Sequence, residues 1–363
     1  MNILHIATIK EWRGGDSQLL NTYGLLESLP DIKQTILCPT GSVLSEKCQA
    51  RQINHYTAPV NSGLSIPFIK TIKKVISDEQ IDIVHVHDSS AFSMILLVIN
   101  FFPNVKLVYS RKRNNRIANN FFKRVKYNHK RVNKIVCVSN AVRDVFDGVV
   151  KDMNKVITIY DSIDVNFFAS QKNTHRLKNE YKLPEDTILV GNIAGLTPQK
   201  DLFTFIDTAD LILQKTDKKI KFVIIGEGEL KNELIAYSNN KKIGEHIIFT
   251  GFRNDVHEVL PELEVLLMTS VEEGLPLTIF EAFAAKTPVV TTRAGGTAEA
   301  VIHDETGYLT EVKATDDLAN GVLRIIGDDA YKEQISKNAS ELVFEKFNLD
   351  RMRNDYHNLY LGL

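Results

Sequence analysis

Short apolar runs alternate with helical stretches along the whole chain. In the first half, each continuous apolar run predicts a buried strand, and each longer stretch between two runs predicts a helix. Apolar strands that are separated by helices indicate a parallel sheet covered on both faces. The expected strands are residues 3–8, 34–38, 83–87, 106–109, 135–138 and 156–159, and the expected helices are residues 17–29, 66–79 and 91–100.

A second alternation of the same kind begins at Ile188. The sequence therefore predicts an α/β protein with two doubly wound, Rossmann-like parallel-sheet domains and a boundary near residues 164–171. We assign residues 1–165 to the first domain and residues 166–345 to the second. Residues 346–363 form a last segment that is helical and aromatic. In open sheets of this kind, ligands bind at the carboxyl ends of the strands.

Two glutamates, Glu273 and Glu281, stand eight residues apart in the second half of the chain. Pro276 suits the first turn of a helix, because its missing N–H needs no partner there. The mostly apolar residues 277–285 predict a buried helix that contains Glu281 and follows the turn that holds Glu273. The two carboxylates therefore flank the start of one helix.

The start of this predicted helix offers a place for a phosphate. The amides of Gly274, Leu275 and Leu277 would point from the helix N-terminus, where free N–H groups and partial positive charge favour an anion. Carboxylates accept hydrogen bonds from sugar hydroxyls but repel phosphate oxygens, so the combination suggests a nucleotide sugar. An isolated pair of glutamates at this spacing is also common by chance, with no task shared between the two.

The segments around the glutamate pair favour a shared binding site over a chance pair. Residues 222–230, 247–255, 265–270 and 288–299 each contain a short apolar strand that ends in a turn. In this order they resemble the C-terminal domain of the retaining glycosyltransferases of family 4, which have the GT-B fold. The resemblance runs over residues 190–309.

The N-terminal half resembles the family more loosely, through residues 13–18, 83–88 and 135–140. The resemblance implies two domains facing each other across a cleft, with residues 346–363 crossing back to pack on the first. It also implies transfer of a sugar, with retention, from a nucleoside-diphosphate donor such as a UDP or GDP sugar to a hydroxyl of a glycan or lipid-linked acceptor. Bacterial surface polysaccharide or lipopolysaccharide synthesis is the expected setting.

The resemblance assigns roles to residues of the second domain. Lys200 would grip the donor diphosphate, and Glu273 would contact hydroxyls of the transferred sugar, so these two carry the chemistry. Glu281 would accept hydrogen bonds from the ribose hydroxyls, and Gly226 would shape the nucleotide pocket. The family usually places an arginine five residues before the lysine, whereas this chain has Gly195. A bidentate arginine holds phosphate better than a lysine, so this departure weakens the expected grip.

Four further candidates lie at or after the carboxyl ends of strands of the first domain: Gly14, Gly15, His87 and Arg111. Gly15 would let the backbone approach a phosphate or sugar closely, but a tight turn explains the two glycines equally well. His87 ends its strand at the expected cleft, while His85 points to the same face and is expected to be a core histidine. Many family members carry a histidine on the next strand, but this chain has no histidine there. Arg111 or Arg113 would then supply the charge missing at Gly195.

Two alternatives stay open. One is a nucleotide-sugar epimerase of the same fold, which would need a set of acids and histidines that the sequence does not offer. The other is a non-catalytic protein that binds a nucleotide sugar or glycan, which the missing arginine allows. No Asp-x-Asp motif occurs, so we expect a metal-independent protein with no cofactor other than the donor substrate. The base and sugar of the donor, the acceptor and the oligomeric state are left undefined.

The charge distribution is uneven although the net charge is −1. Residues 1–165 contain 22 Lys and Arg against 14 Asp and Glu, which leaves 22 against 31 for the remainder of the totals of 44 and 45. Residues 111–134 contain ten Lys or Arg and no acid, together with Phe121, Phe122 and Tyr127. Such a segment suits an anionic membrane or a phosphorylated acceptor, with a solvated helix face as an equal alternative. No nucleic-acid module is recognised, so we expect no nucleic-acid partner.

Composition sets the remaining expectations. At 363 residues and 44% hydrophobic, the chain has room for about two domains. The most apolar run, residues 91–102, is too short to span a bilayer, and residues 1–9 do not read as a signal peptide. Cys38, Cys48 and Cys137 lack metal-ligand spacing and suit buried reduced thiols. We expect a cytoplasmic protein, with peripheral contact to the inner face of the membrane as an option.

Overall fold

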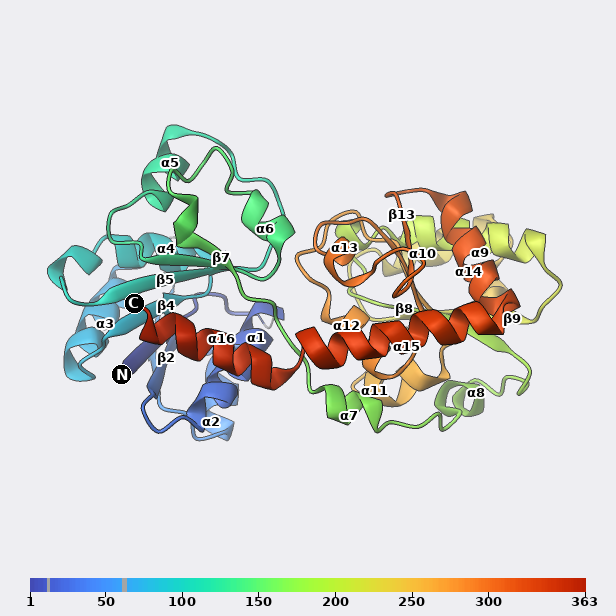
Figure 1. The fold of residues 1–363 in the computed structure, drawn as a ribbon, viewed down its shortest axis with the longest axis horizontal. Helices are drawn as coiled ribbons and strands as arrows, with labels where there is room; N and C mark the ends of the chain where they lie inside the picture. The colour runs from blue at the N-terminus through green and yellow to red at the C-terminus, as the bar shows by residue number, and fades with distance from the viewer. Residues whose placement is uncertain (12–13, 61–63) are drawn as a thin grey trace. The chain divides into compact units, whose positions relative to one another are not determined.

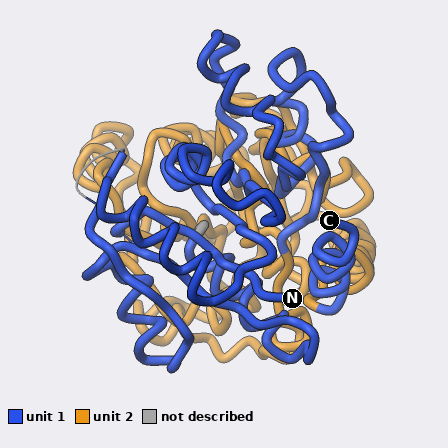
Figure 2. Tube along the Cα trace, turned by 90° about the vertical axis from the view of Figure 1, so that its left-hand side faces the viewer, with its two compact units in different colours: residues 1–161, 350–363 blue, residues 162–349 orange. Residues whose placement is uncertain are grey.

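The computed structural model describes residues 1–11, 14–60 and 64–363. The chain forms two compact units (Figures 1 and 2): residues 1–161 with 350–363, and residues 162–349. Each unit contains one parallel sheet with its own helices, so two doubly wound α/β domains are confirmed. The unit boundaries lie close to the domain boundaries expected at residues 165 and 345.

The described residues of the first unit form a sheet of seven parallel strands in the order β3-β2-β1-β4-β5-β6-β7. The strands are β1 (Asn2–Ile6), β2 (Lys33–Pro39), β3 (His55–Ala58), β4 (Ile83–Val86), β5 (Lys106–Arg111), β6 (Lys134–Cys137) and β7 (Val156–Thr158). The helices are α1 (Gly14–Glu27), α2 (Val43–Ala50), α3 (Ile66–Asp78), α4 (Ser89–Leu96), α5 (Phe121–Tyr127), α6 (Asn140–Asp144) and α16 (Leu349–Leu361), with 3-10 turns η1 (Ile99–Phe101) and η2 (Met153–Lys155).

Both faces of this sheet are covered. Val108 and Tyr109 are consecutive in β5 and therefore point to opposite faces. Val108 packs in a buried cluster with Tyr360 of α16, whereas the ring of Tyr109 stacks on Phe92 of α4 with 4.5 Å between centroids. The final helix is thus part of the core of the first unit.

The sheet of the second unit has six parallel strands in the order β10-β9-β8-β11-β12-β13. The strands are β8 (Ile188–Ile193), β9 (Ile220–Ile225), β10 (Ile247–Gly251), β11 (Val265–Met268), β12 (Val289–Thr292) and β13 (Tyr308–Thr310). The helices are α7 (Val165–Ala169), α8 (Arg176–Glu180), α9 (Leu202–Lys215), α10 (Lys231–Asn240), α11 (Val256–Val259), α12 (Leu277–Ala284), α13 (Thr297–Ala300), α14 (Thr315–Gly327) and α15 (Asp329–Lys346), with 3-10 turns η3 (Pro198–Lys200), η4 (Gly244–His246) and η5 (Leu260–Glu262).

Several boundaries differ from those expected. Helix α1 begins at Gly14, so Gly14 and Gly15 open a helix instead of forming a loop before it. The helix expected over 91–100 is shorter and is followed by the 3-10 turn η1. The C-terminal segment contains the end of α15 at Lys346, a break, and then α16.

Two of the compositional expectations concern structure directly. Cys38, Cys48 and Cys137 are all free and buried, as expected. Among the described residues, no helix combines the length and the hydropathy that crossing a membrane requires.

Candidate functional site

Lys200 and Glu273, the two residues to which the resemblance assigns the chemistry, form an ion pair in the structure. Lys200 ends η3 after strand β8, and Glu273 lies in the loop after β11. The Nζ atom of Lys200 is 2.5 Å from Oε1 of Glu273, and the hydroxyl of Ser270 donates to the same oxygen at 2.7 Å. Glu273 is buried, so its charge is compensated inside the protein by Lys200.

Hydrogen bonds between the two loops hold this ion pair. The amide of Val271 donates to the carbonyl of Gln199 at 2.9 Å. The hydroxyl of Thr269 lies 3.1 Å from the carbonyl of Lys200 and 3.0 Å from that of Asp201, to which it donates. Lys200 and Glu273 are therefore placed by their backbones, and a ligand meets a lysine whose position is already set.

Helix α12 begins directly after Pro276, in agreement with the helix start expected there. Leu275 and Pro276 are buried. In the part of the chain that the structure describes, no protein acceptor meets the N–H groups of Leu277 and Thr278, which lie in the first turn. Free amides at a helix start attract an anion, so the local geometry suits a phosphate. Gly274 lies in the loop between this turn and Glu273.

Glu281 lies one helical turn before the end of α12 and is half-buried. Burial raises the pKa of its carboxyl group to about 7. Among the described residues its carboxylate has no hydrogen-bond or ion-pair partner. A carboxylate that is costly to charge and lacks a partner gains from a ligand that donates hydrogen bonds to it, such as a diol.

Three glycines shape the loops after β8 and β9. Gly226 has a φ of +144°, and a Cβ there would lie 2.0 Å from the carbonyl oxygen of Ala194. A Cβ at Gly228 would lie 2.4 Å from the carbonyl oxygen of Leu196. These two glycines therefore let one loop pack directly on the other. Gly195 is different, because a Cβ there meets no atom closer than 3.8 Å, so the backbone leaves room for a side chain to begin at this position.

Of the two arginines expected to supply that missing charge, Arg113 is exposed, whereas Arg111 already has partners. Arg253, a basic residue of the second unit that could serve in the same way, is engaged as well. Arg111 donates to the backbone carbonyl and side-chain oxygen of Asn115, at 2.5 and 3.1 Å, and its guanidinium lies 5.6 Å from the ring centre of Phe146. Arg253 pairs with Glu180 and Asp255 at 2.8 and 2.7 Å. Arg111 and Arg253 fix local structure within their own units.

Gly14 and Gly15, the two glycine candidates of the first unit, lie next to residues that the structure does not describe. Gly14 and Gly15 form the first residues of α1, but their surroundings, like Trp12 and Arg13, lie outside the described residues. Their expected contact with phosphate or sugar stays a prediction.

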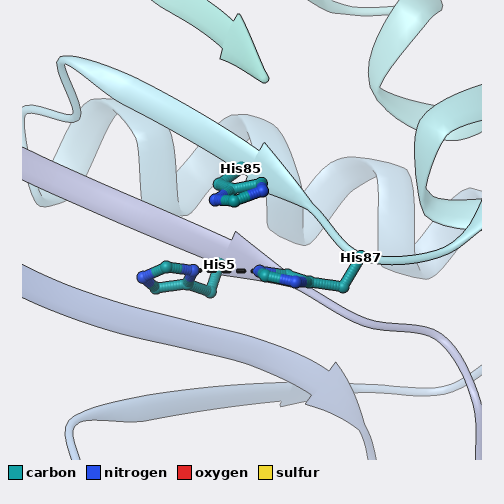
Figure 3. A group of neighbouring side chains, drawn as sticks. All are labelled: His5, His85 and His87. Carbon is teal, nitrogen blue, oxygen red and sulfur yellow. Dashed lines mark hydrogen bonds between the residues drawn. The ribbon is translucent and has the colours of Figure 1, made fainter. Parts of the chain in front are cut away.

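His87 belongs to a cluster of three histidines at the carboxyl end of the first sheet (Figure 3). Its Nε2 is 3.0 Å from Nδ1 of His5, and its ring stacks on His85 with 4.3 Å between centroids. His85 is fully buried and hydrogen-bonded at both nitrogens, by the hydroxyls of Tyr360 and Ser110 at 2.6 and 2.7 Å. It is a satisfied core histidine, as the sequence suggested.

The three rings lie close enough together to suggest a metal centre, since one nitrogen from each falls within 4.8 Å of the others. A metal must lie in the plane of each imidazole that binds it. The rings of His85 and His87 are instead stacked face to face, 28° from parallel, and both nitrogens of His85 are already hydrogen-bonded. The arrangement therefore suits a hydrogen-bonded cluster better than a metal site.

Sequence reasoning missed four residues that surround the candidates. Ser270 bonds to Glu273, and His5 bonds to His87 through the register that pairs β1 with β4. The half-buried Lys112 and the buried Asp161 form a pair with 3.8 Å between Nζ and Oδ2. Ser270 could have been found from its position between a strand end and Glu273, but the other contacts depend on sheet register, which has no local signal.

Two family models match the sequence. The model described as "Glycosyl transferases group 1" matches residues 173–342, and the one described as "Glycosyltransferase Family 4" matches residues 31–167. The chain belongs to the group 1, family 4 glycosyltransferases.

Individual relatives agree with this family. The chain is 26% identical over 226 residues to N-acetyl-alpha-D-glucosaminyl L-malate synthase of Bacillus anthracis, covering 62% of this chain and 58% of that protein. It is also 26% identical over 234 residues to UDP-Gal:alpha-D-GlcNAc-diphosphoundecaprenol alpha-1,3-galactosyltransferase of Escherichia coli, covering 63% and 60%. The chain thus spans about three fifths of the length of these curated relatives.

A solved structure matches the whole chain. Alr3699/HepE of Anabaena, in complex with UDP, is similar with a TM-score of 0.86 at 18% identity, covering 100% of both chains. At this identity the likeness establishes the fold, and the expected GT-B fold is confirmed.

Proposed function

We propose that this protein transfers a sugar from a nucleoside-diphosphate donor to a hydroxyl of an acceptor, with retention at the anomeric carbon. The observation that carries the proposal is the arrangement in the second unit. One region there, at the ends of β8 and β11, contains three features: the Lys200–Glu273 pair, the unpartnered amides that begin α12, and the unpartnered Glu281. A cation and free amides suit a diphosphate, and carboxylates suit hydroxyls.

Each group then has one task. Lys200 and the amides of the α12 first turn stabilise the negative charge on the leaving diphosphate. Glu273, positioned by Lys200 and Ser270, accepts hydrogen bonds from the transferred sugar. Glu281 accepts hydrogen bonds from the ribose hydroxyls, and Gly226 keeps the nucleotide pocket open. No metal is needed for this scheme, because the protein supplies the positive charge.

In the reaction, the bond between the anomeric carbon and the diphosphate oxygen breaks, and a bond to the acceptor oxygen forms on the same face. The acceptor proton passes to an oxygen of the departing diphosphate. The products are the glycoside and the free nucleoside diphosphate. This route requires no nucleophile or general base from the protein, in keeping with a site whose carboxylates are engaged in positioning.

The relatives suggest the class of donor and acceptor. The names of the E. coli relative and of the Anabaena structure include a UDP sugar and UDP, respectively. The E. coli relative also acts on a diphosphoundecaprenol-linked sugar by its name. A uridine-linked hexose as donor and a glycan or lipid-linked acceptor of surface polysaccharide synthesis are the substrates we propose.

A lipid-linked acceptor calls for contact with a membrane, and α5 is the surface we propose for it. Phe121, Phe122 and Val125 of this helix are 74%, 80% and 52% exposed. Lys123 and Arg124 of the same helix supply positive charge beside these apolar side chains, which complements an anionic bilayer. Arg124 of α5 and Lys151 help to line a surface hollow of about 640 Å³ next to this helix. The protein would work at the cytoplasmic face of the membrane.

The donor site is tested by calorimetric titration with UDP-, GDP- and ADP-linked hexoses, followed by an assay for release of nucleoside diphosphate. Lys200→Ala should lower turnover by about 100-fold, the effect of losing one donor that stabilises a transition-state charge. Gly195→Arg should tighten donor binding by about tenfold through a second phosphate contact. Gly195→Gln, which adds a long neutral side chain, is the control and should leave binding nearly unchanged.

The same experiment separates the alternatives. Flat titrations with every donor would end the proposal. Binding without any release of nucleoside diphosphate would indicate a binding protein, and a changed sugar still attached to its diphosphate would indicate an epimerase. Melting curves for each variant show that the loss of turnover is not a loss of fold.

A further inference from the structure

A chain of hydrogen bonds fixes the proton positions on two histidines of the first unit, the buried His5 and the half-buried His87. The side-chain amide of Gln34 donates from Nε2 to the carbonyl of Tyr23 at 2.9 Å. Its Oε1 therefore faces His5, whose Nε2 lies 3.1 Å away and must carry a hydrogen. Burial lowers the pKa of His5 to about 4, so the ring is neutral near pH 7 and its Nδ1 is a bare acceptor.

The next step of this chain sets the state of His87. Its Nε2 lies 3.0 Å from the bare Nδ1 of His5, so Nε2 carries the hydrogen and donates it. Burial is the main cause that lowers the pKa of His87 well below its ordinary value, and the neighbouring His85, His5 and Lys112 act in the same direction. The ring is therefore neutral, and its Nδ1 is left as a bare lone pair. That atom is buried and has no hydrogen-bond partner among the described residues.

Two more groups with unused hydrogen-bonding capacity lie at the same edge of the sheet. His87 directly follows β4 and Lys112 directly follows β5, and these strands are paired. The ammonium of Lys112 contacts Asp161 at 3.8 Å, longer than a hydrogen bond, and Oδ1 of Asp161 is buried without a partner. Buried polar atoms left unpaired cost free energy, so they indicate a ligand or water that completes them.

The chemistry of these groups selects the ligand. A neutral imidazole lone pair and a carboxylate oxygen need a donor, whereas an ammonium group needs an acceptor. Phosphate oxygens at neutral pH offer acceptors only, so they would satisfy Lys112 but face the other two atoms unfavourably. A hydroxyl group donates one hydrogen bond and accepts others, and a sugar offers several such groups.

We propose that His87, Lys112 and Asp161 form a binding site for carbohydrate hydroxyls at the carboxyl end of the first sheet, with Nδ1 of His87 as the acceptor. This inference rests on the proposed function, because the hydroxyls belong either to the transferred sugar or to the acceptor. His5 and Gln34 act through His87 and are positioning residues.

Nitrogen-15 NMR of histidine-labelled protein tests the proton positions and the ligand together. The signals of His87 are assigned among the ten histidines from their loss in a His87→Asn sample. Without ligand, His87 should show a hydrogen on Nε2 and a bare Nδ1. UDP alone should leave Nδ1 unchanged. A shift with UDP-glucose identifies the transferred sugar, and a shift only when methyl glucoside is added with UDP identifies the acceptor.

Two variants separate binding from structure. The side-chain oxygen of asparagine can take the place of Nδ1, whereas the terminal group of glutamine lies nearer to Nε2. His87→Gln should weaken binding of the sugar-bearing ligand by about tenfold, the usual cost of leaving a hydrogen bond unmade. His87→Asn should recover part of that loss, and both variants should bind UDP alone as the native protein does.

Three outcomes would overturn the inference. One is a hydrogen on Nδ1 of His87 in the free protein. Another is a bare Nδ1 that responds to none of the probes although calorimetry shows UDP-glucose bound, which would mean that water alone occupies the site while the donor assignment stands. The third is equal binding by the glutamine and asparagine variants. If calorimetry shows no nucleotide sugar bound at all, the proposed function fails first and this inference fails with it.

Discussion

At the residue scale, the second unit keeps one carboxylate at a cost to stability. Glu281 is half-buried, unpartnered and has a pKa of about 7, against 4.5 in an unfolded chain. Between these two values the folded protein holds a proton that the unfolded chain has released. The free energy of unfolding therefore falls as pH rises from 4.5 to 7, and the deficit is complete above 7.

Glu281→Gln should remove this deficit. The variant should match the native protein in stability at pH 4, where the glutamate is protonated in both states. At pH 8 it should be more stable by at most about 3 kcal/mol, a ceiling that partial exposure lowers. It should also bind the nucleotide part of the donor more weakly, because an amide accepts fewer hydrogen bonds from ribose hydroxyls than a carboxylate. Urea unfolding at the two pH values and calorimetry with UDP check both effects.

The matched control is Glu272→Gln, which changes a glutamate close by in the sequence that has no role in the proposed site. Because this variant keeps Glu281, its free energy of unfolding should fall between pH 4.5 and 7 as that of the native protein does. Equal stability of native protein and Glu281→Gln at pH 8 would show that Glu281 is charged without penalty, and the argument from its burial would then be wrong.

The sequence indicated which residues make up the candidate site but not the contacts between them. The spacing of Glu273 and Glu281 and the position of Pro276 were visible, because all three belong to one local turn and helix. The ion pair between Lys200 and Glu273 was not predicted, since the resemblance gave the two residues separate ligands. The bond between His5 and His87 depends on the pairing of two strands far apart in the chain.

At the element scale, prediction succeeded where burial leaves a continuous apolar run. The central strands were found for that reason, whereas β3 was missed. This strand lies at the edge of its sheet, and the sequence His-Tyr-Thr-Ala that forms it is mostly half-exposed. The start of α1 was misplaced because two glycines disfavour a helix, yet they begin one here.

Helix α5 shows what structure adds to a run of basic residues. Lys126 donates from Nζ to Ser89 and Ser93 of α4 at 2.7–2.9 Å, so it anchors the helix and is unavailable for a membrane. Burial lowers its pKa to about 8. The groups that remain for an anionic surface include Lys123 and Arg124, with Phe121 and Phe122 exposed beside them.

Replacing Lys123 and Arg124 by glutamine should weaken binding to vesicles that contain phosphatidylglycerol. Each basic residue near an anionic surface contributes about 1 kcal/mol, so about fivefold should be lost per residue. Phe121→Ser with Phe122→Ser should weaken binding further at high salt, where charge is screened. Vesicle pelleting measures both, with Lys70→Gln and Lys74→Gln on α3 as a control that removes the same charge from another exposed helix. Equal pelleting of all four proteins would contradict the membrane contact.

At the scale of the whole molecule, the chain returns to its first unit at the end. Residues 350–363 belong to that unit, and Met352, Tyr356 and Tyr360 are buried in its core with Ile3 and Val108. The first unit is therefore incomplete until the last residues are present. The pattern of residues in this segment predicted a helix, but only the resemblance suggested where that helix packs.

The hydroxyl of Tyr360 is the most specific contact of this closing helix, because it bonds to the buried His85 at 2.6 Å. Tyr360→Phe keeps the ring but leaves one nitrogen of His85 unpaired, so it should lower the free energy of unfolding of the first unit by about 1–3 kcal/mol. Tyr308→Phe in the second unit is the matched control, since the hydroxyl of Tyr308 has no hydrogen bond among the described residues. Chemical unfolding followed by histidine NMR signals reports on the first unit separately, because His5, His85 and His87 all lie there. If both variants unfold as the native protein does, the last helix is held by its apolar contacts alone and the Tyr360–His85 bond adds nothing.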